Sequence, residues 1–319
     1  MAAAKTLSHP RAWPPGHRTV CNDRCMDVAL ATYSLLPGGA DWDRPVVTAL
    51  EEAGTRVAYE AWDDPAVDWS AYDLVLIRSV YDYSQRRDEF VAWSQRVGER
   101  LHNPPAIVEW NSHKGYLGEL AAAGVPVIPT AYVEPGGAPP ALDGTVVVKP
   151  AVSAGGRDSG RFGPATHEAA RELIGAIGAS GRTAMVQPFQ ASVETTGEAA
   201  LVYFDGKLSH ALRKGAVLPP DQVAPQVEGL PGLSAAAAMF DPGLVRSAPA
   251  APEELALGDT VIAHLAERFG RTPLYARVDM VPGEDGPLIM EIELIEPNFY
   301  FDLTEGAAER LAAALLARV

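Results

Sequence analysis

The sequence is poor in lysine, cysteine and long apolar runs, and each shortage excludes a class of protein. Its 319 residues carry 26 lysines and arginines against 41 aspartates and glutamates, a formal net charge of −15, and only five of the cations are lysines. Nucleic acid and anionic membrane surfaces both require a surplus of cations. We therefore expect neither partner, and any anionic ligand must be bound by a few locally placed cations.

The N-terminal stretch and the cysteines indicate a location. No run approaches the ~20 apolar residues of a membrane helix, and residues 1–25 lack the apolar core of a secretory signal. We expect a cytoplasmic protein whose residues 1–25 form a disordered leader. Cys21 and Cys25 both lie in that stretch, which excludes a disulfide framework for the rest of the chain. The alternative for the two thiols is a metal site with His9 or His17.

Residues 26–110 are predicted to form a parallel α/β domain, because apolar runs alternate with segments of helical period. The expected strands are 28–32, 56–61 and 74–78, and the expected helices are 45–53 and 87–97. Functional groups gather at the carboxyl ends of such strands. Arg78, Tyr81 and Tyr83 come at or directly after the end of the third run, and Arg78 either meets a substrate carboxylate or forms a surface salt bridge.

Residues 111–319 are predicted to form a second, larger unit of mixed strands and helices. Helices are expected at 111–124, 167–177, 253–269 and 304–317, and strands at 145–149, 184–189, 199–204, 207–213, 275–281 and 288–295. Asp205-Gly206 between two of these strands is a strong hairpin signal. Residues 216–252, rich in Pro, Gly and Ala, are expected to form a long loop or lid.

Scarce lysines mark a possible phosphate site. Lys149 ends an apolar strand and is followed by a loop that contains Gly155, Gly156 and Gly160. A lysine in that place can contact phosphates while the backbone N–H groups of the loop close over them. Lys114 precedes the strand. The alternative is that each lysine is a solvated side chain.

Carboxylates near the C-terminus suggest a metal site. Glu291 and Glu293 alternate with apolar residues and share one face of a strand, and Asp279 faces them if the two strands pair. Such a cluster suits Mg²⁺, which takes few oxygen ligands from protein and the rest from phosphate and water. The cations Arg277, Arg213 and Lys214 could neutralise charge that develops during phosphoryl transfer. The alternatives are an acidic surface stripe and salt bridges among these residues.

The order of these motifs resembles the ATP-grasp fold over residues 105–319. The resemblance is carried by Lys114, Lys149 with its glycine-rich loop, Val186-Gln-Pro-Phe189, Arg277-Val-Asp279 and Glu291-Ile-Glu293. It implies an α/β protein with an α+β ATP-binding part and an N-terminal parallel α/β pre-ATP-grasp domain. ATP and Mg²⁺ are the implied cofactors. Many members have Asn at the position of Glu293. The glutamate of this sequence adds a negative charge there.

The resemblance also implies a role for each matched residue. Lys114 and Lys149 would contact ATP phosphates, covered by a mobile loop that includes Ser153, Gly155, Gly156 and Arg157. Gln187, Pro188 and Phe189 would form the adenine hinge, and Glu194 would bind the ribose. Asp279, Glu291 and Glu293 would hold Mg²⁺, and Arg277 would stabilise the transferred phosphoryl group. Glu296 and Asn298 would be further ligands or substrate contacts.

A wider match, including Asn103-Pro-Pro105, His210–Gly215 and Glu291–Pro297, is similar to the subgroup of cycloserine synthetases, the O-ureido-D-serine cyclo-ligases. It implies an ADP-forming ligase of antibiotic biosynthesis that activates a carboxylate as an acyl phosphate and closes a ring onto a nitrogen of the same molecule. Two alternatives are a ligase that joins two molecules and a nucleotide-binding protein without turnover. The substrate would be a small amino-acid-like molecule whose carboxylate meets Arg78, Arg213 or Lys214. A homodimer is one possible assembly.

Overall fold

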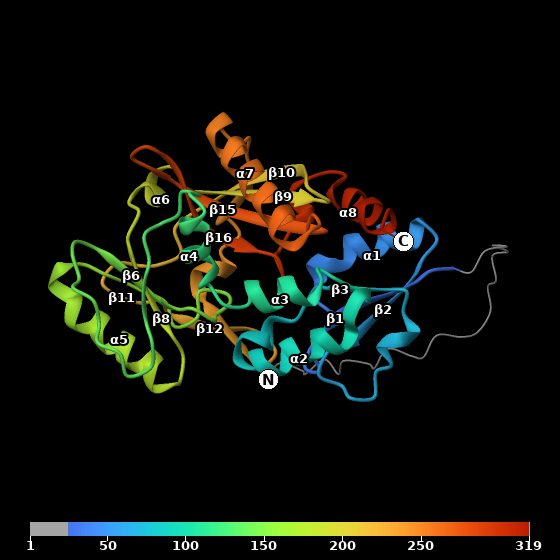
Figure 1. The fold of residues 1–319 in the computed structure, drawn as a ribbon, viewed down its shortest axis with the longest axis horizontal. Helices are drawn as coiled ribbons and strands as arrows, with labels where there is room; N and C mark the ends of the chain where they lie inside the picture. Colours follow the sequence, from blue (N-terminus) through green and yellow to red (C-terminus); the bar gives the residue numbers. More distant parts are fainter. Residues whose placement is uncertain (1–24, 319) are drawn as a thin grey trace, which may run out of the picture.

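The computed structural model describes residues 25–318. Its N-terminal part is a parallel sheet with helices on both faces. Strands β1 (Asp27–Thr32), β2 (Arg56–Ala61), β3 (Leu74–Ile77) and β4 (Leu101–His102) are arranged in the order β2-β1-β3-β4. Helix α1 (Arg44–Glu52) covers one face and α2 (Arg87–Val97) the other (Figure 1). The two predicted helices and three predicted strands are therefore confirmed, while the hypothesis of a metal site at Cys21 and Cys25 with His9 or His17 involves residues outside the described part.

The central part is an antiparallel sheet with one helix packed on it. Strands β5 (Ala131–Val133), β6 (Val146–Pro150), β7 (Gly160–Phe162), β8 (Ala184–Pro188) and β11 (Gln222–Val223) follow the order β11-β7-β6-β8-β5. Helix α5 (His167–Ala179) lies against this sheet and shares its apolar core (Figure 1). The glycine-rich loop 151–159 leaves β6 at Pro150 and returns as β7.

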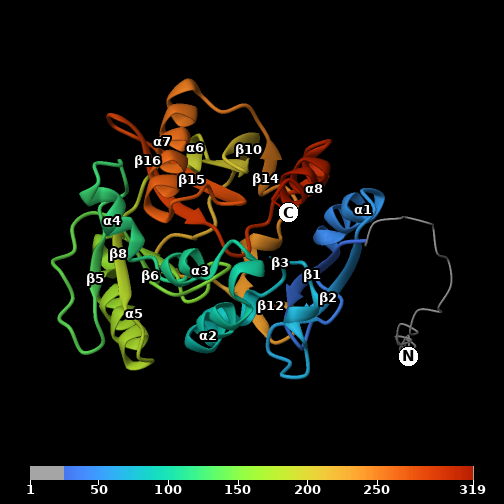
Figure 2. The ribbon, with the colours of Figure 1, turned by 45° about the vertical axis from the view of Figure 1, so that its right-hand side comes forward.

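The C-terminal part is a second antiparallel sheet, and it supplies the floor of the site. Strands β9 (Glu198–Phe204), β10 (Lys207–Lys214), β14 (Val245–Ser247), β15 (Tyr275–Gly283) and β16 (Gly286–Glu293) follow the order β14-β10-β9-β15-β16. Helix α7 (Pro252–Phe269) packs on one face, with Leu257, Val261 and Leu265 buried. Helix α8 (Ala307–Leu316) lies beside α1 and joins the core of the C-terminal sheet to that of the N-terminal domain (Figure 2).

The predicted helix 111–124 is wrong in its boundaries. The chain forms α3 (Pro105–Asn111), a turn, and α4 (Tyr116–Ala122). Asn111 does not cap a helix start, because its side chain donates to the Ile292 carbonyl at 2.7 Å and accepts from the Leu294 amide at 2.8 Å. Lys114 consequently lies in the turn between the two helices, where its side chain is buried.

The segment 216–252 is more ordered than the predicted loop. Besides β11 and β14 it contains a hairpin of β12 (Gln226–Leu230) and β13 (Leu233–Ala236). Its tip reaches the N-terminal domain, where Leu233 is buried in the domain core and Tyr33 Oη donates to the Pro231 carbonyl at 2.9 Å. At its other end the Ala236 amide donates to the Gly155 carbonyl at 2.8 Å. The hairpin therefore links the N-terminal domain to the glycine-rich loop.

The described residues also bear on a membrane location. No helix among residues 25–318 is long and apolar enough to cross a bilayer.

Candidate active site

A cavity of about 870 Å³ lies where the three parts meet. Its lining includes Lys149 of β6, Gln187 at the end of β8, Lys214 of β10, Arg277 of β15, Glu291 of β16 and Trp42, Tyr81 and Tyr83 from the N-terminal domain. The described lining residues include no histidine or cysteine. Cations and carboxylates therefore supply the ionic chemistry of this cavity.

Most of the predicted site residues come together here. Fourteen line the cavity: Lys114, Lys149, Ser153, Gly155, Gly156, Gln187, Pro188, Phe189, Lys214, Arg277, Glu291, Glu293, Glu296 and Asn298. They come from both antiparallel sheets and from the loops that follow β6, β8 and β16. Their positions are compatible with the implied roles, which remain predictions.

Strand register places the acids and Arg277 together, as expected from alternation. In the β15–β16 pair, Asp279 lies opposite Glu291 and Arg277 opposite Glu293. The Arg277 guanidinium binds Glu293 and also donates to Asp279 Oδ2 at 2.8 Å. Asp279 is 1% exposed and does not line the cavity, so it acts on the site through its two cationic neighbours, Arg277 and Lys214.

Three of the lining cations are held by carboxylates. Lys214 Nζ binds Glu198 and lies 2.9 Å from Asp279 Oδ2, while Lys114 Nζ lies 3.0 Å from Glu291 Oε1 and donates to the Ser153 carbonyl at 2.8 Å. Burial works to raise the pKa of Asp279, but the charges of Arg277 and Lys214 outweigh it and lower that pKa below its usual value. Asp279 therefore stays ionised between its two cations.

Lys149 differs from its neighbours. Within residues 25–318 no ion pair or side-chain hydrogen bond joins its ammonium group to another residue. Burial is the main influence and lowers its pKa, Glu291 opposes this and Lys114 adds to it. A half-buried cation without a counter-ion is unfavourable unless a ligand supplies the charge. The arrangement fits a site for an anion such as a phosphate.

Arg78 is placed away from the cavity, contrary to its predicted contact with a substrate carboxylate. Its side chain is fully buried, and its Nε and Nη2 donate to Asp43 Oδ1 at 2.9 and 2.7 Å. Nη2 also donates to the Pro297 carbonyl at 3.1 Å. The structure shows a salt bridge, but a fully buried one and not the surface pair of the alternative, and Asp43 neutralises the charge that a substrate would need.

Arg213 also faces away, because neighbouring side chains of a strand point to opposite faces. Its guanidinium makes a bidentate pair with Glu254 of helix α7, at 2.8 and 3.0 Å. It is outside the cavity lining. Lys214, the next residue, points into the cavity.

Two predicted nucleotide residues lie beyond the cavity wall. Arg157 donates to the Ser84 hydroxyl at 2.6 Å and ties the glycine-rich loop to the N-terminal domain. The Glu194 side chain is 47% exposed and pairs with Arg161 at 2.7 Å. Arg161 in turn lies 3.5 Å above the ring of Phe189. A rotation of Glu194 toward a ribose would have to break that pair.

Glu198, Trp42, Tyr81 and Tyr83 were missed as site residues. Glu198 is buried opposite Lys214 in the β9–β10 ladder. The two tyrosines directly follow the third strand of the N-terminal domain, a position that the sequence indicates but that was assigned no role.

The donor set suits a magnesium ion only together with another ligand. Glu291 and Glu293 present carboxylate oxygens to the cavity, the atoms that Mg²⁺ prefers. Among residues 25–318, however, no group of three or more Asp, Glu, His or Cys side chains is arranged to hold a metal ion. Phosphate oxygens would have to complete the coordination.

Comparisons with known proteins agree with this geometry. The family of the N-terminal domain of D-cycloserine synthetase DcsG matches residues 28–103. The cycloserine biosynthesis protein DcsG of Streptomyces lavendulae is 36% identical over 296 residues, which cover 88% of this chain and 94% of that protein. The crystal structure of D-cycloserine synthetase DcsG matches with a TM-score of 0.79 at 32% identity and covers 92% of this chain and 99% of that chain.

A more distant match extends the same fold. A RimK-domain ATP-grasp protein of Sphaerobacter thermophilus matches with a TM-score of 0.61 at 17% identity, covering 91% of this chain and 99% of that chain. The fold and the relatives define an ATP-grasp protein, that is, an ATP-dependent ligase. Within that class, the chain belongs to the cycloserine synthetase family.

Proposed function

We propose that the protein closes the ring of D-cycloserine from O-ureido-D-serine, with ATP converting the substrate carboxylate to an acyl phosphate. A nitrogen of the ureido group then attacks the acyl carbon and phosphate leaves. Loss of the carbamoyl group consumes one water molecule and releases carbon dioxide and ammonia. The observation that carries the proposal is one continuous cavity with the uncompensated Lys149 among its lining cations and an aromatic wall from the N-terminal domain.

The cations provide the activation half of the reaction. Lys149 and Lys114 would bind nucleotide phosphates, and Arg277 would stabilise charge on the transferred phosphoryl group. Glu291 and Glu293 would hold Mg²⁺, which neutralises phosphate charge when bound. Gln187, Pro188 and Phe189 would contact the adenine.

The aromatic wall that the N-terminal domain contributes to the cavity would contact the substrate. Trp42, Tyr81 and Tyr83 line the cavity, and the β12–β13 hairpin contributes Leu230 and Ala235. A closed wall of this kind keeps water from an acyl phosphate. The ring closure itself gains from having both reacting groups in one molecule.

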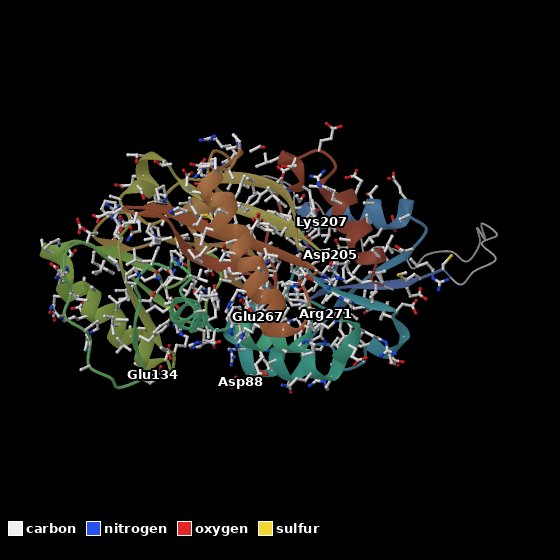
Figure 3. The ribbon with its side chains drawn as sticks, turned by 45° about the horizontal axis from the view of Figure 1, so that its top comes forward. Asp88, Glu134, Asp205, Lys207, Glu267 and Arg271 are labelled. Atoms are coloured by element: carbon white, nitrogen blue, oxygen red, sulfur yellow. The ribbon has the colours of Figure 1, made fainter. Side chains whose placement is uncertain are left out.

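The function is tested by ADP release and product analysis. The wild type should release ADP faster when O-ureido-D-serine is added, and mass spectrometry should detect D-cycloserine. Lys149→Met should weaken ATP binding roughly 10- to 100-fold, the value of one charge-assisted hydrogen bond. Lys207→Met is the matched control, because Lys207 is exposed at the outer β9–β10 turn (Figure 3).

Two results would contradict the proposal. One is ADP release that the substrate does not stimulate in the wild type, which would favour a nucleotide-binding protein without turnover. The other is a product that contains a second added amine, which would show an intermolecular ligase.

A further inference from the structure

Glu296 is a cavity carboxylate that no cation holds. Three other lining glutamates are each paired: Glu198 with Lys214, Glu291 with Lys114 and Glu293 with Arg277. Within the described chain, no ion pair or side-chain hydrogen bond joins Glu296 to another residue, and its carboxyl group bonds only to its own backbone. Its oxygens are therefore available to a ligand in the cavity.

The backbone around Glu296 is held in place on both sides by buried donors. Four carbonyl groups accept hydrogen bonds: Leu294 from Asn103 at 2.9 Å, Ile295 from the Tyr275 hydroxyl at 2.8 Å, Pro297 from Arg78 at 3.1 Å and Asn298 from Arg277 at 3.1 Å. The donors come from three separate segments of the chain, because Tyr275 and Arg277 both lie on β15. A side chain with a fixed base and free terminal atoms is the arrangement that a catalytic group requires.

The charged and titratable groups around Glu296 come from several elements. They are Glu291 and Glu293 of β16, Lys114 before α4, Tyr275 of β15, and Tyr81 and Tyr83 of the turn after β3. Burial is the largest influence, and together with Glu293 it raises the pKa of Glu296 to about 8. A base whose pKa lies near the working pH is efficient in proton transfer. The tyrosines stay protonated, since burial raises the pKa of each.

We propose that Glu296 is the base that receives the proton of the attacking nitrogen, an inference that rests on the ligase function proposed above. The nitrogen lone pair attacks the acyl carbon, and the C–N bond forms. The C–O bond to phosphate breaks, and phosphate leaves with its electron pair. The N–H proton passes to a carboxylate oxygen of Glu296, which becomes a neutral carboxylic acid and later releases the proton to solvent.

The other groups that line the cavity are poorly suited to this step, and the lining aspartates Asp41, Asp241 and Asp302 are exposed to solvent. The described lining contains no histidine or cysteine, and Lys214 and Arg277 are charged and paired. Glu291 and Glu293 are engaged by Lys114 and Arg277. Glu296 is the lining glutamate that combines a fixed backbone with unpaired oxygens.

The experiment separates carboxylate activation from nitrogen attack. Hydroxylamine traps an acyl phosphate as a hydroxamate, and it is unprotonated at neutral pH, so it needs no base. In Glu296→Gln, hydroxamate formation from O-ureido-D-serine and ATP should stay within about twofold of wild type, which also shows that the variant is folded. Formation of the ring product should fall by about 10²- to 10⁴-fold, the usual value of a general base.

The pH profile adds a second readout. The wild-type rate of ring formation should rise with pH as the raised pKa of Glu296 is passed and its carboxyl group ionises, and Glu296→Gln should lack this rise. Glu305→Gln makes the same chemical change at an exposed position outside the cavity lining and should leave both rates unchanged.

Three outcomes would overturn the inference. Ring formation at the wild-type rate in Glu296→Gln would show that no base is needed there. An equal loss of hydroxamate and ring product would place Glu296 before nitrogen attack. Absence of substrate-dependent hydroxamate and ADP in the wild type would contradict the ligase function and the inference together, whereas the first two outcomes leave the ligase function intact.

Discussion

Arg78 shows at the scale of one residue how burial changes a role. The guanidinium lies between Asp43 and the Pro297 carbonyl and 4.5 Å from the centre of the Phe299 ring. It thereby joins the N-terminal sheet to the segment that carries Glu296. Arg78 is a positioning residue, and the buried Asp43 carboxylate neutralises its charge.

We expect Arg78→Met to lower the free energy of unfolding by about 3–5 kcal/mol, because it leaves the buried Asp43 carboxylate without its partner. Urea unfolding measures the change. Asp43→Asn combined with Arg78→Met should recover part of it. Arg44→Met is the control, since Arg44 and Asp41 form an exposed pair whose loss should cost less than about 1 kcal/mol. A similar loss of stability in Arg78→Met and Arg44→Met would contradict the explanation by a buried ion pair.

Glu296 carries a pH dependence of stability that has a definite sign. Its pKa is about 8 in the folded protein against a usual value of 4.5. Between these values the unfolded chain has lost a proton that the folded chain keeps. The stability that the neutral carboxyl group contributes is therefore lost as the pH rises, by at most about 1.4 kcal/mol per pH unit and by less where solvent reaches the side chain.

Glu296→Gln should accordingly be more stable than wild type at pH 8, and the difference should vanish near pH 4.5. Urea unfolding at both pH values, without nucleotide, measures it. Glu305→Gln should show no such trend. A difference that is the same at both pH values would mean that Glu296 does not titrate between them.

The positions of the site residues were largely predictable, but their partners were not. Three of the five lysines, Lys114, Lys149 and Lys214, were expected around the ligand and line the cavity. The pairing of Lys214 with Glu198 depends on an irregularity between Leu208 and His210 that shifts the register of the hairpin by one residue. Hydrophobic alternation does not reveal such a shift. The Arg78–Asp43 pair joins residues 35 apart and has no periodic signal at all.

At the scale of an element, the β12–β13 hairpin is the segment that local pattern describes least well. No residue of β12 is buried and β13 buries only Leu233 and Ala236, so a continuous apolar face is lacking and the sequence indicates a loop. What orders it is distant contact, through Leu233 and Pro231 at one end and Gly155 at the other. Gly155 has φ +63°, and a Cβ there would lie 2.9 Å from the Cβ of Ala235, so glycine permits this close approach.

Leu233→Ala should weaken the anchor of the hairpin and admit water to the acyl phosphate. Replacing a buried leucine by alanine lowers stability by roughly 2–5 kcal/mol, and here the hairpin is the segment mainly destabilised. We expect fewer ring products for each ADP released, measured as the ratio of D-cycloserine to ADP. Leu208→Ala is the control because Leu208 is 42% exposed on β10. An unchanged ratio, with faster hydrogen exchange in β12 and β13, would contradict a role of the hairpin in excluding water.

At the scale of the whole molecule, three sheets meet at one cavity. The order of most strands and helices was predictable from their period and turn signals; the β12–β13 hairpin and the break between α3 and α4 are the exceptions. The meeting point was not predictable, since it depends on α8 packing beside α1 and on the hairpin crossing to the first domain. The α1–α8 contact connects residues at least 255 positions apart and the Tyr33–Pro231 contact residues 198 apart, and a single sequence carries no local trace of them.

The arrangement of charges predicts how the molecule responds to chelation. Because no group of metal-type side chains among residues 25–318 is arranged to hold an ion alone, EDTA should leave the unfolding temperature unchanged when nucleotide is absent. With ATP, EDTA should remove the thermal shift and the turnover, since the ion and the phosphates are expected to bind together. A lower unfolding temperature on adding EDTA without ATP would show a resident metal instead.

The two walls of the cavity are encoded in separate stretches of the gene. The residues expected to activate the carboxylate lie between Lys114 and Glu293, whereas Trp42, Tyr81 and Tyr83 belong to the first hundred residues, and the β12–β13 hairpin is the later segment that joins their wall. Substitutions in that early stretch can therefore change the N-terminal wall of the cavity while the residues that activate the carboxylate stay the same. A change of substrate then needs no change in the activating residues. Hybrid enzymes can accordingly be built by exchanging the early stretch between relatives.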